Sequence, residues 1–227
     1  MTNDAAGRLL PISGAAAGIL WAVSTVGADI WLNPPDSVGD PARVERVFLD
    51  HEPAAWIMIL GSIYLAVAII FFAAAVQRAT SRSAHGMAAL GGGVLLAVAM
   101  IVHQGIGKFA VLIAAHNHDK ESIHTLGYFD AVTWLLLGAG AGAFLLATGI
   151  ASLQSRAMPK WLSVVTVVLG VIALLGPGAL VFYIVAPVWF IGTSIAINRR
   201  MKAALNQPHA DHHEMPARGD EYAAARQ

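Results

Sequence analysis

The sequence predicts an all-α protein that crosses a membrane several times, and its composition and apolar runs carry this prediction. Of its 227 residues, 57% are hydrophobic and only 12% are charged, and the mean hydropathy is +0.64. In soluble domains, roughly a quarter of the residues are charged. The apolar runs are about 20 residues long, which an α-helix needs to cross a hydrocarbon core of roughly 30 Å. We therefore expect a polytopic membrane helical bundle.

Charge and cysteine content exclude several classes of partner and cofactor. The formal net charge is zero, so no global basic field attracts nucleic acid, and we expect no nucleic-acid partner. Cysteine is absent, which excludes disulfides, iron–sulfur clusters and other cysteine-ligated metals. The sequence also lacks phosphate-binding, HExxH, GxSxG and dinucleotide motifs.

The apolar pattern divides residues 1–202 into membrane spans and leaves a polar, flexible cytoplasmic tail at 203–227. Six spans are predicted, at about residues 10–32, 54–76, 87–114, 128–153, 159–175 and 179–198. The first is too long for the core of a signal peptide, so we expect it to be retained. In the first and fourth spans, pairs of glycines four residues apart allow close approach of helices in lipid. These pairs are Gly14 with Gly18 and Gly138 with Gly142.

The first loop, residues 33–53, contains a short amphipathic helix at 40–51. Asp40 followed by Pro41 is typical of a helix N-cap with proline at the first helical position. Apolar residues then recur at helical spacing between charged ones. We expect this helix to lie on the membrane or to cover the end of the bundle.

The positions of lysine and arginine predict the orientation of the bundle. One set of loops and ends contains Arg8, Arg78, Arg82, Arg156, Lys160, Arg199, Arg200 and Lys202. In the other set, acidic residues outnumber the basic ones. Because lysine and arginine favour the cytoplasmic side, we expect both termini there and the amphipathic helix in the first outer loop.

Polar residues in three spans fall at the same predicted depth, near the outer surface. Asp29 lies one turn from the end of span one, where the helix dipole disfavours an anion, so it needs a partner. Our first choice is Lys108. Together with Asp130 at the start of span four, these residues predict an outward-facing polar pocket, to which His103 and Gln104 also contribute. The alternatives are that Lys108 reaches the membrane surface and that Asp130 only complements a helix N-terminus.

Spans five and six support a pocket independently. Seventeen helical residues reach only about 25 Å, so the turn at Gly176-Pro177-Gly178 would lie below the outer surface. Pro187 leaves the carbonyl of Tyr183 without its helical donor, which is tolerated at depth where the backbone is buried or lines a cavity. We therefore add Tyr183 to the pocket. An ordinary kink in a small bundle is the alternative interpretation.

Histidines in an outer loop could bind zinc or copper. The candidate ligands are His116, His118, Asp119 and His124. A second cluster, between His209 and Glu214, lies in the tail. Solvated loop residues are the alternative for both clusters, and we expect no other cofactor. Haem ligation is disfavoured because His103 is the only histidine well inside a span.

The connector Arg156-Ala157-Met158-Pro159-Lys160-Trp161-Leu162 and the apolar run at 164–175 have a recognisable pattern. A basic turn with proline precedes Trp-Leu and a helix that contains glycine. From Ala143 to Arg200, the chain resembles uncharacterised bacterial six-helix integral membrane proteins, a domain of unknown function. The resemblance implies a multi-pass protein of the bacterial cytoplasmic (inner) membrane, and it implies no activity.

Three functions are compatible with these residues. The first is a bundle whose outer pocket binds or passes a small molecule or ion. The second is an intramembrane enzyme that acts on a lipid or isoprenoid, with Asp29 or Asp130 as a buried catalytic acid, as in terpene cyclases. The third is a structural or regulatory subunit of a larger membrane complex or of a homo-oligomer. In each case the lipid bilayer is a partner.

Overall fold

In a computed structural model of the protein, residues 3–34, 38–80, 83–175 and 178–205 are described, and nearly all of them are helical. The bounds are α1 Asn3–Leu20, η1 Trp21–Gly27, α2 Ala28–Leu32, α3 Pro41–Asp50, α4 Glu52–Ala79, α5 Ala84–Met100, η2 Ile101–Gly107, α6 Lys108–His116, α7 Lys120–Ser155, α8 Lys160–Leu174 and α9 Gly178–Leu205. The segments η1 and η2 are π-helical turns inside longer helices. The turn at Gly176-Pro177, the tail from residue 206 and the cluster between His209 and Glu214 lie outside the described residues.

Five helical segments in the described part of the chain are long and apolar enough to cross a membrane. They are Ile12–Leu32, Glu52–Ala79, Ala84–His116, Lys120–Ser155 and Gly178–Arg200. Large apolar side chains point outward from them, such as Ile30 and Val188, which are each 73% exposed. The predicted all-helical fold is thus confirmed for the described residues, and the long apolar helices fit a membrane protein. The remaining predicted span corresponds to α8, which is apolar but has only 15 residues.

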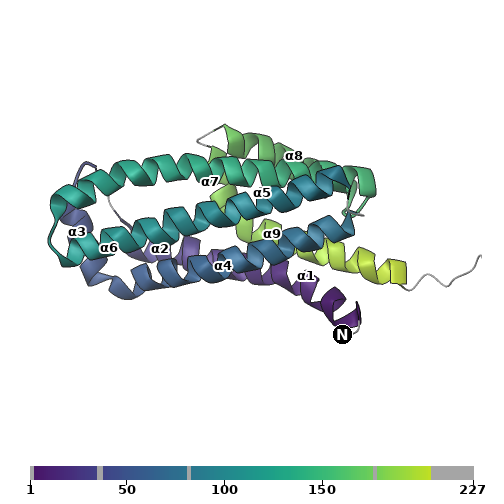
Figure 1. Ribbon diagram of the computed structural model, residues 1–227, viewed down its shortest axis with the longest axis horizontal. Helices are drawn as coiled ribbons and strands as arrows, with labels where there is room; N and C mark the ends of the chain where they lie inside the picture. Colours follow the sequence, from purple (N-terminus) through teal and green to yellow (C-terminus); the bar gives the residue numbers. More distant parts are fainter. Residues whose placement is uncertain (1–2, 35–37, 81–82, 176–177, 206–227) are drawn as a thin grey trace, which may run out of the picture.

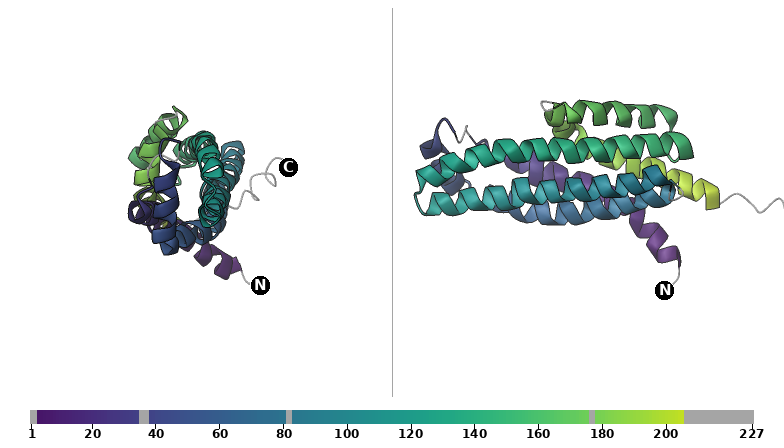
Figure 2. Two further views of the ribbon diagram at one scale, coloured as in Figure 1. Left: turned by 90° about the vertical axis from the view of Figure 1, so that its left-hand side faces the viewer. Right: turned by 45° about the horizontal axis from the view of Figure 1, so that its top comes forward.

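The long helices form a ring in which neighbours in sequence are neighbours in space. Around the ring, α1 contacts α4, α4 contacts α5, α5 contacts α7, α7 contacts α8, α8 contacts α9, and α9 returns to α1. The helix α3 lies across one end, which we call the α3 end (Figures 1 and 2). The beginning of α1 and the end of α9 both lie at the opposite end, the termini end (Figure 1).

Aromatic rings fill the middle of the bundle. Trp21 packs edge-to-face on Phe182 at 5.3 Å between centroids, and Phe72 packs on Phe190 at 5.4 Å. Phe144 stacks on Phe190 at 6.4 Å. All of these rings are buried. A layer of packed aromatic rings therefore occupies the interior at mid-height.

The hairpin of α8 and α9 is shorter than the rest of the bundle. The helix α8 runs along only the part of α7 nearer the termini end, so α9 begins part-way along the bundle (Figures 1 and 2). Its 15 residues reach about 22 Å, compared with a hydrocarbon core of roughly 30 Å. This side of the bundle therefore stops below the α3 end.

Small residues bring the helices of this ring close together. A Cβ atom on Gly18 would lie 2.7 Å from the Pro187 carbonyl oxygen of α9, and one on Gly138 would lie 2.9 Å from the Ala173 carbonyl oxygen of α8. Neither site has room for a side chain. The two predicted glycine pairs thus mark the α1–α9 and α7–α8 contacts.

The amphipathic helix of the first loop forms as predicted and covers the α3 end. The Asp40 side chain caps it by accepting a hydrogen bond from the Arg43 amide at 3.0 Å, with Pro41 at the first helical position. Its buried residues, Val44 and Phe48, face the bundle, where α3 contacts α6 and α7. Of the two predicted placements, the structure has the one in which the helix covers the bundle.

The helix α7 begins at Lys120, eight residues before the predicted start of span four. The cause is an N-cap: the Asp119 carboxylate accepts hydrogen bonds from the Ser122 amide at 3.0 Å and the Ser122 hydroxyl at 2.5 Å. These bonds lower the pKa of Asp119 below its ordinary value. His124, predicted to lie in a loop, is therefore on a helix.

Candidate functional site

A cavity of about 480 Å³ lies beneath α3, at the end of the bundle where the α8–α9 hairpin stops short. The pocket residues predicted from the sequence all line it: Asp29, His103, Gln104, Lys108, Asp130 and Tyr183. Its cover comes from the first loop and α3, through Pro34, Val38, Val44 and Phe48. The five long helical segments, which include α4 through Met58, and the covering helix therefore surround one cavity.

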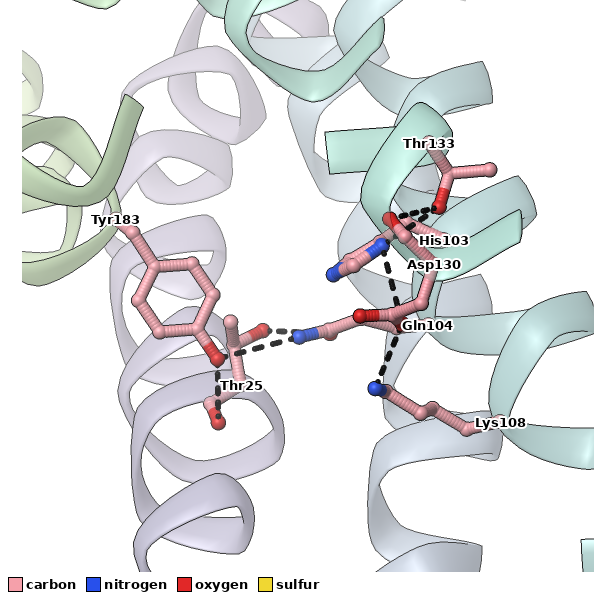
Figure 3. Close-up of polar contacts among 7 residues, drawn as sticks. All are labelled: Thr25, His103, Gln104, Lys108, Asp130, Thr133 and Tyr183. Atoms are coloured by element: carbon pink, nitrogen blue, oxygen red, sulfur yellow. Dashed lines mark hydrogen bonds and ion pairs between the residues drawn. The ribbon is translucent and has the colours of Figure 1, made fainter. Parts of the chain in front are cut away.

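Both π-helical turns lie at the level of this cavity. Thr25 of η1 donates its hydroxyl hydrogen to the Gln104 Oε1 of η2 at 3.0 Å. The Gln104 Nε2 in turn donates to the Tyr183 hydroxyl at 3.5 Å, and that hydroxyl donates to the Thr25 backbone carbonyl at 3.2 Å. The three residues form a closed ring of hydrogen bonds, completed by the Thr25 backbone carbonyl (Figure 3). Such π-helical turns occur frequently at functional sites.

Lys108 forms an ion pair with Asp130 across the α6–α7 contact. Its Nζ lies 2.8 Å from the Asp130 Oδ1, and the lysine side chain is only 12% exposed. Lys108 therefore bends into the bundle (Figure 3), and the alternative that it reaches the membrane surface is wrong. Asp130 also does more than complement a helix N-terminus, because it forms an ion pair with Lys108, the only lysine among the described residues that line the cavity.

The predicted pairing of Asp29 with Lys108 is wrong. Asp29 interacts with the Tyr183 hydroxyl and, at longer range, with the Lys108 ammonium, but its carboxylate has no cation within 4.0 Å among the described residues. The reason is helix order: α6 packs on α7, which carries Asp130, whereas α2 packs on α4. Asp29 is left as a carboxylate in the cavity wall without an ion-pair partner.

His103 is held through Thr133 in a defined orientation. Thr133 donates its single hydroxyl hydrogen to the Asp130 carbonyl at 2.9 Å. Its Oγ1 therefore accepts a hydrogen bond from the His103 Nδ1, which lies 2.9 Å away. The same Nδ1 is 3.7 Å from the Asp130 carboxylate. In the neutral imidazole, Nε2 is then the acceptor, and it points away from Thr133 (Figure 3).

The Trp134 side chain adds an aromatic wall to the cavity. Its ring centroid is 5.3 Å from the His103 ring and 5.3 Å from the Tyr183 ring. Trp134 is half-buried and lines the cavity. Aromatic faces carry negative charge density, so this wall favours a cation.

The proline in α9 has the effect that its position predicts. Pro187 cannot donate to the Tyr183 carbonyl, and the Trp21 indole Nε1 donates to that oxygen at 3.0 Å instead. The freed carbonyl thus joins η1 to α9 next to the hydrogen-bonded ring of Thr25, Gln104 and Tyr183. The freed carbonyl is therefore hydrogen-bonded inside the protein. A break in a membrane helix is tolerated where the backbone is buried in protein in this way.

The predicted metal ligands do not come together. His116 contacts the Leu112 carbonyl and Glu52, and His118 binds Glu45 at 2.6 Å. Asp119 caps α7, and the His124 Nδ1 lies 3.0 Å from the Val38 carbonyl. Within the described ranges, no three side chains of histidine, aspartate or glutamate are placed to hold a metal ion. Two of them instead attach the covering segment, His118 through Glu45 of α3 and His124 through the Val38 carbonyl.

Three residues of the site were missed from the sequence: Thr25, Thr133 and Trp134. Threonine hydroxyls in helices commonly bond to a carbonyl of their own helix, so their type carries no signal of a contact between helices. Trp134 lies in the outer part of a predicted span, where tryptophan is expected in any membrane protein. Spacing offers a weak signal, since Asp130, Thr133 and Trp134 share one face of α7.

Comparison with models of known protein families, with curated proteins and with solved structures finds no match for this chain. The geometry of the site therefore carries the functional argument.

Proposed function

We propose that this protein is a membrane receptor or carrier that binds a small organic cation in the cavity beneath α3. One observation carries the proposal: Asp29, on the cavity wall, lacks an ion-pair partner among the described residues. Lys108, the only lysine among the described lining residues, is paired with Asp130. The described lining residues include two carboxyl groups and one ammonium, so with both carboxyls ionised they leave one negative charge that a bound cation would neutralise.

The size and walls of the cavity agree with this ligand class. A volume of about 480 Å³ falls within the range of small-molecule sites, roughly 300–1,000 Å³. Trp134 and Tyr183 present aromatic faces to a cation, and His103 supplies an acceptor for an N–H or O–H group. The aromatic layer below, with Phe72 and Phe190 at 5.4 Å, favours binding over free passage.

The test measures binding of choline, ethanolamine and tetramethylammonium to the purified protein, with acetate as the anionic comparison. Thermal stability and tryptophan fluorescence report on binding. We expect at least one cation to bind and acetate not to bind. Because a hydrogen bond or contact to a charged group contributes about 1.5–3 kcal/mol, Asp29→Asn should bind about ten- to hundredfold more weakly.

Asp50→Asn is the matched control, since Asp50 is an exposed acid at the end of α3 that does not line the cavity. Cation binding that survives in Asp29→Asn and weakens in Asp50→Asn would contradict the proposal. Turnover of an isoprenoid that depends on Asp29, without cation binding, would instead support the enzyme alternative.

We also propose a topology of six membrane segments, with α8 as the short fifth segment and both termini in the cytoplasm of a bacterial cell. Two observations support it. The beginning of α1 and the end of α9 lie at the same end of the bundle (Figure 1), which requires an even number of crossings. Basic residues gather there, such as Arg78, Arg156 and Arg200, and they favour the cytoplasmic side. The family resemblance at 143–200 stays a prediction.

A further inference from the structure

A second cavity, of about 630 Å³, is a groove on the outside of the bundle between α8 and α9. Its two sides are apolar, and they are formed by Leu162, Val165 and Leu169 of α8 and by Val185 and Val188 of α9. Val165 is 43% exposed and Val188 is 73% exposed. The groove therefore opens toward the surroundings of the bundle, away from the cavity beneath α3.

The floor of the groove is defined by a glycine and a hydrogen bond. Gly192 lines the groove, and a Cβ atom built on it meets no atom within 4 Å. Next to it, the Trp189 Nε1 donates to the Thr166 Oγ1 at 2.9 Å, which holds α9 against α8. The groove is thus open over Gly192, where α9 lacks a side chain.

The end of the groove nearer the termini is positively charged. Arg199 and Arg200 line it and are exposed, and neither takes part in an ion pair within the described part of the chain. The helix α8 begins at the same end, after Pro159, with no side chain capping its free amides. Trp161, 67% exposed, lies beside it, at a position typical of tryptophan at the membrane surface.

The apolar length of the groove matches one leaflet of a bilayer. From Val185 to Ile195, both in the groove wall, the helix rises about 15 Å. Half of a hydrocarbon core of roughly 30 Å is the same length. An acyl chain lying in the groove would therefore run from the bilayer midplane to the basic end.

We propose that the groove between α8 and α9 binds an anionic phospholipid. Its phosphate would accept hydrogen bonds from Arg199 and Arg200, and one acyl chain would lie over Gly192. The two guanidinium groups supply the charge complementarity, because they pair with phosphate in a fork-shaped geometry. This site is separate from the cation cavity, and it stands whether or not that cavity binds a cation.

The test counts lipids bound to the purified full chain in detergent by native mass spectrometry. Phosphatidylglycerol is compared with phosphatidylcholine that has the same acyl chains. We expect phosphatidylglycerol to bind preferentially. Because each basic side chain near an anionic lipid contributes roughly fivefold in affinity, Arg199→Gln/Arg200→Gln should bind phosphatidylglycerol roughly tenfold more weakly or worse. Gly192→Leu, which fills the floor, should lose most of the bound lipid.

Two controls match these variants. Gly91→Leu makes the same change at an exposed glycine that also has open space around it, and Arg78→Gln/Lys202→Gln removes the same charge outside the groove. Both should keep the preference for phosphatidylglycerol. Equal binding of the two lipids, or equal losses in variants and controls, would overturn the proposal. So would a Gly192→Leu protein that keeps its lipid and only changes its oligomeric state, because the groove would then be a contact between copies.

Discussion

The hydroxyl group of Thr133 fixes which ring nitrogen of His103 faces the cavity. Thr133 uses its hydrogen for the Asp130 carbonyl and accepts from the His103 Nδ1 at 2.9 Å. His103 is only 4% exposed, so Thr133 is the main acceptor available to its Nδ1. The unprotonated side of the ring is thereby assigned to the cavity, where it can accept a hydrogen bond from a ligand.

At this residue scale, we predict that Thr133→Val destabilises the protein by about 1–2 kcal/mol, because a buried N–H group loses its acceptor while the volume stays the same. The measurement is the midpoint of thermal unfolding in detergent. Thr148→Val is the control on the same helix: the Thr148 Oγ1 is buried and has no hydrogen-bond partner within the described residues, so its removal should be neutral or stabilising. Equal losses in both variants would show that the His103–Thr133 bond contributes nothing measurable.

At the scale of elements, the close approach of α1 to α9 positions Thr25 and Tyr183 for the hydrogen-bonded ring at the cavity. The helix α1 continues into η1, which carries Thr25, and α9 carries Tyr183. Gly18 allows this approach because a Cβ atom there would lie 2.7 Å from the Pro187 carbonyl oxygen. The Trp21–Tyr183 bond of 3.0 Å forms just above it. A glycine contact thus sets the distance that the hydrogen-bonded ring of Thr25, Gln104 and Tyr183 needs.

We predict that Gly18→Val separates α1 from α9 and costs about 1–3 kcal/mol, as overpacking of a close contact does. Gly91→Val is the control, because Gly91 has open space around it. Thermal unfolding measures the loss, and the Trp21 environment can be followed by fluorescence. Should Gly18→Val unfold at the same temperature as Gly91→Val, the contact is not the one that holds these helices together.

At the scale of the whole molecule, the bundle has two unlike ends. The α3 end is covered, contains the cavity and bears the acidic first loop, whereas the termini end is basic and contains the mouth of the lipid groove. The aromatic layer between them separates the two sites, with Phe144 and Phe190 at 6.4 Å. The cavity and the groove are therefore separate sites, and a ligand bound in one does not reach the other.

The absence of cysteine allows a direct test of orientation. We predict that a membrane-impermeant maleimide labels Glu121→Cys on intact cells, and labels Gln154→Cys only after the cells are permeabilised. Both residues are exposed, and they lie at opposite ends of α7. Labelling in the reverse order would invert the proposed topology, and labelling of both on intact cells would show that α7 does not cross the membrane.

The depth of the polar residues could be predicted from the sequence, but their partners could not. Hydropathy places Asp29, Lys108 and Asp130 at one level, because each is a fixed number of 1.5 Å steps from a span boundary. Which carboxylate takes the lysine depends on which helices are neighbours, and the pattern along one chain does not contain that order. The π-helical turns were also missed, since the residues at 21–27 and 101–107 have no composition that distinguishes them from an ordinary helix.

The short hairpin leaves the rim of the bundle uneven. Leu180, near the start of α9, lines the cavity and is also 52% exposed, so in the proposed topology the cavity would border on hydrocarbon along this flank as well as on water beneath α3. An amine with an alkyl tail suits such a boundary: its head would reach the carboxylate while its tail stays dissolved in the bilayer. A ligand of that shape would enter the cavity directly from the bilayer, without passing through water.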